Sequence, residues 1–174
     1  NGTRSPAVVS LPVRVQTSVR FKSITVGAEH TCAIDLDNLA WCWGSNDSSQ
    51  LGRVPASSPS TGTLFSTTPV LVLPNSSSNF VEFQSISAGS QHTCAIDLSG
   101  AAGCWGSNVL ARAGIDVNLC GGAPVTMQCD FSNPVMTAAS GPFFNLRFTS
   151  ISAGDLNTCG IDTVGFVQCW GASF

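Results

Sequence analysis

The sequence is poor in charge. Only 10% of its 174 residues are Asp, Glu, Lys or Arg, and the net charge is −3, whereas an average globular protein is about 25% charged. Nucleic acid requires a basic face, so we expect no nucleic-acid partner. No apolar run approaches the roughly 18 residues of a transmembrane helix, so we expect no membrane span.

The motifs of common enzyme classes are also missing. The chain contains only two histidines, His30 and His92, and no Gly-x-Ser-x-Gly elbow, phosphate-binding loop or dinucleotide fingerprint. We therefore expect no enzymatic activity and no cofactor.

What the sequence does contain is one stretch present three times. It reads HTCAIDLDNLAWCWGSN at 30–46, HTCAIDLSGAAGCWGSN at 92–108 and NTCGIDTVGFVQCWGAS at 157–173. Each copy begins with His or Asn before Thr-Cys, places a second Cys ten positions after the first, and continues with Trp-Gly. Copies spaced about 60 residues apart predict a repeat architecture.

The cysteine spacing predicts a hairpin in each copy. If Cys32 lies opposite Cys42, a three-residue loop joins the two strands. Such a loop needs a left-handed residue at its last position, and the copies place Asn38, Gly100 and Gly165 there. The cysteines then form a non-hydrogen-bonded pair with α-carbons about 4.5 Å apart, which a disulfide can span.

Four disulfides follow from this spacing and from the remaining cysteines. Three cross the hairpins, and the fourth pins an insertion at 109–132: Cys32–Cys42, Cys94–Cys104, Cys159–Cys169 and Cys120–Cys129. With all eight cysteines paired, the chain is expected to occupy an oxidising compartment.

Candidate glycosylation sites agree with that compartment. Asn1, Asn46 and Asn75 each begin an Asn-x-Ser/Thr acceptor triplet. The segment 53–79 is dominated by Ser, Thr and Pro, a composition expected in an exposed loop that carries O-glycans. Together these features predict an extracellular glycoprotein, either secreted or part of a cell-surface appendage.

Short alternating runs between the copies predict further strands and no helices. Pro-Val runs (7–15, 69–72 and 134–136) precede Phe-x-Ser-Ile runs (21–27, 83–89 and 148–154). Four short strands per unit predict an all-β fold made of β-propeller blades, each a sheet of four antiparallel strands. We expect three units: 1–52, 53–108 and 109–174, the last truncated at its end.

The repeated motifs carry a resemblance to a known family. The order Pro-Val, Ser-Ile-x-Ala-Gly, His-Thr-Cys-Ala-Ile, Cys-Trp-Gly-Ser-Asn, with Gln50-Leu51-Gly52 after the first copy, resembles the regulator of chromosome condensation repeat, in a secreted, cysteine-bearing branch. The resemblance implies a seven-bladed β-propeller with one unit per blade. Because this chain has three units and Asn157 replaces the His of the third, we expect a partial propeller or a fragment of a longer array.

The repeated polar residues have structural interpretations. His30 and His92 are residue types that bind zinc, but the third copy lacks the His and the cysteines pair with each other. We predict instead that the histidines hydrogen-bond backbone at the strand entry. Asp35, Asp97 and Asp162 recur before each turn and are expected to hydrogen-bond local backbone rather than to serve as the acids of a glycosidase.

The tryptophans are expected to pack between blades. Trp43, Trp105 and Trp170 follow the second Cys of each copy, so they face away from the disulfide of their own hairpin. The alternative is a platform on which a sugar ring stacks. Trp41, which is absent from the other copies, is the better candidate for such an exposed contact, although core packing is the favoured interpretation.

These observations favour a structural function. The leading hypothesis is a self-assembling module, a repeating subunit of a surface or fibrous assembly whose partners are other copies of itself. The second hypothesis is a secreted propeller that captures a protein or glycan through loops such as 109–132. The family name also suggests guanine-nucleotide exchange on a small GTPase, but disulfides and glycosylation sites argue against an intracellular partner.

Overall fold

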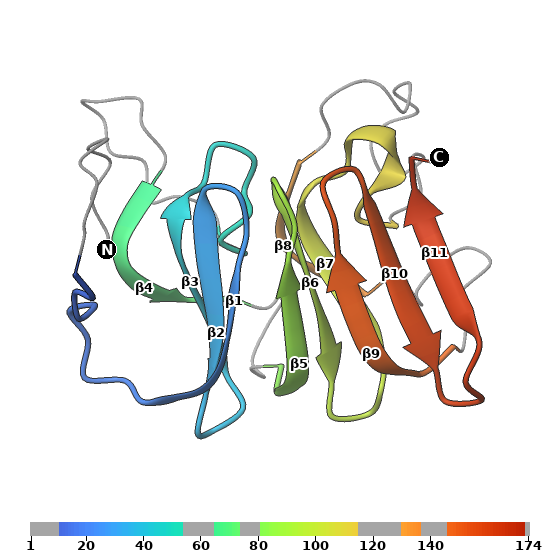
Figure 1. Ribbon diagram of the computed structural model, residues 1–174, viewed down its shortest axis with the longest axis horizontal. Helices are drawn as coiled ribbons and strands as arrows, with labels where there is room; N and C mark the ends of the chain where they lie inside the picture. The colour runs from blue at the N-terminus through green and yellow to red at the C-terminus, as the bar shows by residue number, and fades with distance from the viewer. Residues whose placement is uncertain (1–10, 54–64, 74–80, 115–129, 137–145, 173–174) are drawn as a thin grey trace.

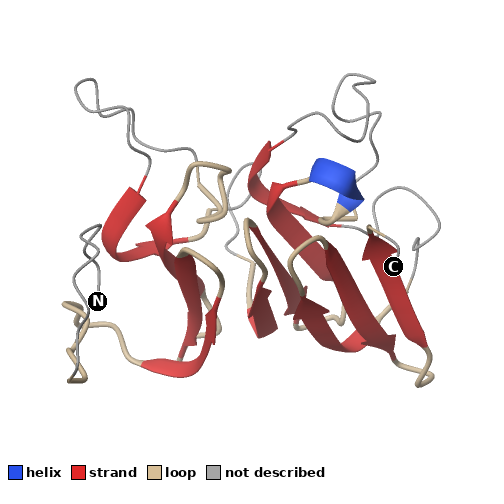
Figure 2. Cartoon of the chain, turned by 45° about the horizontal axis from the view of Figure 1, so that its top comes forward, coloured by secondary structure: helices blue, strands red, loops and turns tan. Residues whose placement is uncertain are grey.

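The computed structural model describes residues 11–53, 65–73, 81–114, 130–136 and 146–172, with the backbone alone for 130–136. Within these ranges the chain forms three antiparallel sheets and one short 3-10 helix, Val109–Ala111 (Figure 2). The expected all-β fold of propeller blades is therefore confirmed.

Each sheet is one blade, and its strands follow one another in chain order. Blade 1 contains β1 (Phe21–Val26), β2 (His30–Asp35), β3 (Ala40–Ser45) and β4 (Phe65–Leu71). Blade 2 contains β5 (Phe83–Ala88), β6 (His92–Asp97), β7 (Ala102–Ser107) and β8 (Asp130–Met136). Blade 3 contains β9 (Phe148–Ala153), β10 (Asn157–Asp162) and β11 (Val167–Gly171) in the described ranges.

The hairpins form as the cysteine spacing predicts. Cys32 pairs with Cys42, and the other two cysteine pairs occupy the same position in their own hairpins. The last loop residue has a positive φ in every copy: 66° at Asn38, 86° at Gly100 and 96° at Gly165. An Asn or Gly at this position lets the chain enter the left-handed region at little steric cost.

The blade boundaries differ from the predicted units. The Pro-Val run at 69–72 supplies β4, which pairs with β3 of blade 1 rather than starting blade 2. In the same way β8, which holds the Pro-Val run at 134–136, pairs with β7 of blade 2. A repeat period fixes the length of a unit but not the residue at which a sheet begins, so the boundary at 52/53 was wrong for the sheet.

The N-terminal strand prediction fails where it can be compared. Residues 11–20 form no strand, and residues 7–9 lie outside the described ranges. An extended run becomes a strand only with a hydrogen-bonding neighbour, and no described strand pairs with 11–20.

The three blades lie side by side in chain order, with blade 1 at the left of Figure 1 and blade 3 at the right. β5 packs against β1 and β2, and β9 packs against β5 and β6. We call the side of a blade that faces the next blade its rear face, and the side that faces the preceding blade its front face.

Two apolar clusters fill the seams between blades. Between blades 1 and 2, the rear-face residues Cys32, Ile34 and Cys42 meet the front-face residues Phe83 and Trp105. Between blades 2 and 3, Cys94, Ile96 and Cys104 form a cluster with Phe148, against which Trp170 packs. Trp105 and Trp170 therefore face away from their own disulfides and pack on the preceding blade, as the sequence predicts.

Candidate interaction site

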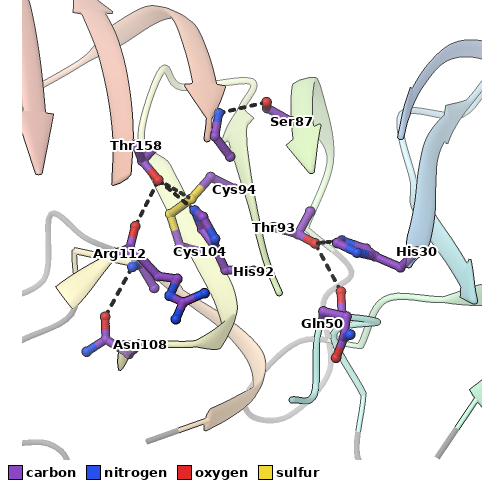
Figure 3. Close-up of a disulfide and its surroundings, with 12 residues drawn as sticks. His30, Gln50, Ser87, His92, Thr93, Cys94, Cys104, Asn108, Arg112 and Thr158 are labelled. Carbon is purple, nitrogen blue, oxygen red and sulfur yellow. Dashed lines mark hydrogen bonds between the residues drawn. A yellow bond between two sulfur atoms is a disulfide. The ribbon is translucent and has the colours of Figure 1, made fainter. Parts of the chain in front are cut away.

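A buried hydrogen-bond chain crosses the seam between blades 1 and 2. His30 Nε2 lies 2.8 Å from Thr93 Oγ1, and the Thr93 hydroxyl donates to the carbonyl oxygen of Gln50 at 3.0 Å (Figure 3). The indole N–H of Trp105 donates to the same carbonyl at 2.9 Å. All four residues are buried. These hydrogen bonds therefore join the two blades at a place where water does not compete for the same donors and acceptors.

The same arrangement returns between blades 2 and 3. His92 Nε2 lies 2.8 Å from Thr158 Oγ1, and the Thr158 hydroxyl donates to the carbonyl oxygen of Arg112 at 2.8 Å (Figure 3). The predicted partner of the histidines, backbone at the strand entry, is thus wrong. The partner is a threonine hydroxyl of the next blade, because each ring crosses the seam.

These contacts define the protonation of the histidines. The single hydroxyl proton of Thr93 goes to Gln50, so Thr93 must accept the proton on His30 Nε2. The Nδ1 atoms of His30 and His92 are buried and have no hydrogen-bond partner among the described residues. Burial lowers the pKa of His30 to about 4. Burial, with the charge of Arg112 as a second cause, lowers the pKa of His92 to about 3.

A second pair of bonds joins the inner strands of adjacent blades. The backbone N–H of Ala88 donates to Thr25 Oγ1 at 3.1 Å. That of Ala153 donates to Ser87 Oγ at 2.9 Å, and the bond to Ser87 is drawn in Figure 3. Sequence reasoning missed these residues as well as Thr93, Thr158 and Gln50. For the hydroxyl residues the sequence did contain a signal. Thr25, Ser87 and Ser152 share one position of the repeat, and Thr31, Thr93 and Thr158 share another.

The three hairpin disulfides are present in the structure. Each joins α-carbons 4.1 Å apart, at Cys32–Cys42, Cys94–Cys104 and Cys159–Cys169. A bridge that closes so short a loop removes about 3 kcal/mol of unfolded-state entropy in the chain-entropy description. The fourth predicted bridge, Cys120–Cys129, lies outside the described residues.

The repeated carboxylates form the turns, as predicted. Asp35 Oδ1 accepts the backbone N–H groups of Asp37 at 2.9 Å and Leu39 at 2.8 Å. Asp97 and Asp162 make the equivalent bonds in the other two hairpins. These carboxylates are therefore occupied by their own loops.

Trp41 is half-buried and held against its own hairpin. Its indole N–H donates to Asp35 Oδ2 at 2.7 Å. Its use in an exposed contact stays a prediction.

One of the predicted glycosylation sites does not suit the folded chain. Asn46 is 3% exposed, its Oδ1 accepts the backbone N–H of Leu51 at 2.9 Å, and its Nδ2 donates to the carbonyl of Arg53 at 3.4 Å. A glycan on Nδ2 would require that nitrogen to reach solvent, so the structure argues against Asn46 as an acceptor. Asn1 and Asn75 lie outside the described residues.

Within the described residues, the two outermost blade faces carry exposed apolar side chains. On the rear face of blade 3, Ile161 is 42% exposed and Val167 66% exposed, whereas the equivalent Ile34 and Ala40 of blade 1 are 0% and 2% exposed. The Cys159–Cys169 bridge lies on this rear face, and Cys169 is exposed. On the front face of blade 1, Ile24 is 65% exposed.

Other kinds of site are not seen in the described part of the chain. Its His, Cys, Asp and Glu side chains form no group of three or more that could hold a metal ion. None of its helices is long and apolar enough to cross a membrane.

Comparison with known proteins agrees with the blade geometry. Two family models described as "Regulator of chromosome condensation (RCC1) repeat" match, one at residues 37–96 and the other at 21–50 and 83–110. The ultraviolet-B receptor UVR8 of Arabidopsis thaliana is 22% identical over 172 residues, covering 90% of this chain and 36% of the receptor. The chain therefore spans about a third of that relative.

Solved structures show the same fold. Yeast RCC1 (Prp20), solved with Kap60 bound, aligns with a TM-score of 0.67 and 21% identity over 87% of this chain and 32% of that one. The ectodomain of the Physcomitrella patens receptor kinase CR4 aligns with a TM-score of 0.51 and 21% identity, over 89% of this chain and 30% of that one. From the matched repeats, the blades and the shared fold, we conclude that this chain belongs to the regulator of chromosome condensation (RCC1) repeat family.

Proposed function

We propose that the chain is a structural module of an extracellular glycoprotein and that it associates with other copies of itself through its open blade faces. The observation that carries this proposal is the exposure of Ile24, Ile161 and Val167, since their equivalents inside the array are covered by a neighbouring blade. Exposed apolar faces of this kind mark contact sites.

The repeated polar groups support a structural rather than a chemical role. The histidines bind threonines across the seams, the aspartates form turns, and the hairpin cysteines are bridged. Each of these groups is occupied by the scaffold, so none is left to act on a substrate. We accordingly propose no enzymatic activity.

The extracellular setting is supported by the disulfides. Bridges of this kind persist in oxidising compartments and are rare in the cytosol. The fold itself is compatible with that setting, since the CR4 receptor kinase carries it in an ectodomain. We include N-glycans at Asn1 and Asn75, but not at the buried Asn46, and O-glycans on 53–79 in the proposal.

The test of this function is sedimentation of the oxidised chain over a range of concentrations. We expect association that grows with concentration and persists at high salt, because the exposed side chains Ile24, Ile161 and Val167 are apolar. A compact monomer at millimolar concentration would refute the self-association. Intact mass before and after deglycosylation tests the glycoprotein part independently.

A second candidate function is capture of a protein or glycan through the hairpin tips. The three β-hairpin loops lie on the same side of the molecule, at the bottom of Figure 1. They expose Leu36, Leu98, Val164 and Phe166. Binding of a ligand that is lost in a Leu36→Ser, Leu98→Ser double variant, while self-association is retained, would favour this candidate.

A further inference from the structure

We propose that the peptide unit between Val109 and Leu110 has two accessible orientations and that the side chain of Arg112 selects the one observed. This peptide unit lies in the loop that follows β7 and includes the first residues of the predicted insertion at 109–132. Because Arg112 also binds blade 3, its side chain couples the start of the insertion to the docking of blade 3. The inference does not depend on self-association.

Blade 1 contains the matching loop, at 46–52. The backbone N–H of Ser49 donates to the carbonyl oxygen of Asn46 at 3.0 Å, and that of Ala111 donates to the carbonyl oxygen of Asn108 at 2.9 Å. These bonds close two β-turns at the same position of the repeat. Ser49 and Ala111 end the turns with positive φ values of 61° and 57°. The two loops therefore begin and end in the same way.

The two turns differ in the middle. Leu110 has a φ of 58° and a ψ of 29°, whereas its counterpart Ser48 does not have a positive φ. Neither Asp47 nor Val109, the preceding residues of the two turns, has a positive φ. Negative φ at both central residues is typical of a type I turn, and a positive φ at the second is typical of a type II turn. Because these types differ in the two torsions on either side of the central peptide unit, that unit points in opposite directions in the two blades.

The orientation in blade 2 is unfavourable for a leucine. At positive φ a Cβ atom crowds the backbone carbonyl oxygen, so type II turns usually place Gly or Asn at the position of Leu110. A residue held in this region persists only where surrounding contacts compensate for the strain. Some contact of the loop must therefore favour the observed orientation.

Arg112 supplies that contact. Its Nε donates to the carbonyl oxygen of Val109 at 3.0 Å. The equivalent residue of blade 1, Gln50, makes the opposite contact, because its Oε1 accepts the backbone N–H of Ser48 at 2.8 Å. An Arg side chain carries donors only, whereas the Gln amide offers an acceptor. The acceptor in blade 1 binds the N–H end of the central peptide unit, and the donor in blade 2 binds its carbonyl end.

The guanidinium of Arg112 also reaches blade 3. Its Nη1 lies 3.3 Å from Ser90 Oγ and donates to the carbonyl oxygen of Asp155, between β9 and β10, at 3.4 Å. Arg112 is 4% exposed and lies between the loop of blade 2 and Thr158 of blade 3 (Figure 3). The turn itself contacts β11 of blade 3. Since the donors of a guanidinium have a fixed planar geometry, displacing blade 3 would also displace the group that holds the peptide unit.

The first experiment exchanges the donor and the acceptor. Arg112→Gln copies blade 1, so residue 110 should lose its positive φ. The three-bond coupling between its amide and α protons, measured by NMR on the oxidised chain, reports this angle. Gln50→Arg is the reciprocal change and should give Ser48 a positive φ. Either variant tests the inference, so it remains testable if one of them fails to fold.

The second experiment is a double-mutant cycle. Leu110→Gly relieves strain only where φ is positive. It should therefore lower the equilibrium constant of unfolding at least about fivefold more in the wild type than in an Arg112→Gln background. The cycle cancels the stability that Arg112→Gln loses through its other contacts. Ala111→Gly is the matched control, because this position has a positive φ in both kinds of turn, and its effect should be equal in the two backgrounds.

Hydrogen exchange tests the coupling to blade 3. The backbone N–H of Ser90 donates across the seam to the carbonyl oxygen of Gly154 at 3.2 Å. In Arg112→Gln its exchange should become at least ~10-fold faster. The N–H of Ala88, which crosses the seam between blades 1 and 2, is the internal control and should exchange as in the wild type.

Two results would overturn the inference. If residue 110 keeps its positive φ in Arg112→Gln, or if Leu110→Gly has the same effect in both backgrounds, Arg112 does not select the orientation. If the orientation changes but exchange at Ser90 does not, or if Ser90 and Ala88 accelerate equally, the peptide unit is not coupled to the docking of blade 3.

Discussion

Thr93 Oγ1 lies 2.8 Å from His30 Nε2, although 63 positions separate the two residues and they belong to different blades. The Thr93 hydroxyl also donates to the carbonyl of Gln50. One hydroxyl therefore connects the start of β2 in blade 1, the loop after β3 and the start of β6 in blade 2. Thr158 has the same position between blades 2 and 3. Thr93 and Thr158 therefore each hydrogen-bond their own blade to the blade before it.

Replacing Thr93 by Val should destabilise the chain strongly. The change is nearly isosteric but leaves the buried N–H of His30 without an acceptor, which costs about 2 kcal/mol of unfolding free energy. The matched control is Thr31→Val, at the same position of blade 1, where the side chain is half-buried and contacts no preceding blade among the described residues. Its effect should be within about 0.5 kcal/mol. Urea unfolding measures the free energy of unfolding of both variants. Equal losses would contradict the role of Thr93 in joining blades 1 and 2.

Acid should weaken the seams. His30 and His92 have pKa values of about 4 and about 3 in the fold, below the ordinary value near 6.5. Their contribution to stability is therefore fully present above pH 6.5 and is lost as pH falls toward 4 for His30 and toward 3 for His92, because the unfolded chain binds protons that the folded chain does not. At pH 5 the loss should be about 2 kcal/mol per histidine.

The third repeat suggests a control variant for this pH dependence. His92→Asn copies the third repeat, where Asn157 stands at that position. In that variant about half of the loss between pH 7.5 and pH 5 should disappear, and urea unfolding at the two pH values measures it. A pH dependence unchanged by His92→Asn would show that other groups cause it.

Local features of the fold could be predicted from the sequence, since they depend on short spacings. The ten-residue separation of the cysteines, together with Asn or Gly at the end of the loop, fixed the register of each hairpin, and Cys32 indeed pairs with Cys42. The aspartate turns follow from the same local chemistry. The direction of Trp105 follows from the alternation of side chains along a strand.

Contacts between units could not be predicted in the same way. The pairing of β4 with β3 and the bond from His30 to Thr93 join residues whose distance depends on how the blades stack. A single sequence shows that a position recurs but not which neighbour it contacts. For that reason the histidines were matched to the wrong partner, and the predicted unit boundary at 52/53 cut through a sheet.

Asn46 should carry no glycan in the folded protein and should instead stabilise its turn. Its Oδ1 accepts the N–H of Leu51, so Asn46→Ala should cost about 1 kcal/mol of unfolding free energy. Asn108 makes the same kind of bond to Ala113 at 3.1 Å but begins no acceptor triplet, so Asn108→Ala should have a similar effect and serves as the control. Peptide mass mapping after enzymatic deglycosylation should find Asn46 as Asn, and its conversion to Asp would contradict this prediction.

The three hairpin disulfides should react with reductant in a fixed order. Cys32, Cys42, Cys94 and Cys104 are fully buried in the seams, whereas Cys169 is exposed on the open rear face of blade 3. Because an attacking thiolate needs access to a sulfur atom, mild reductant under native conditions should open Cys159–Cys169 first. Alkylation followed by peptide mass mapping should label Cys159 and Cys169 while the other two bridges remain intact. Simultaneous opening of all three bridges would instead show that reduction proceeds through global unfolding.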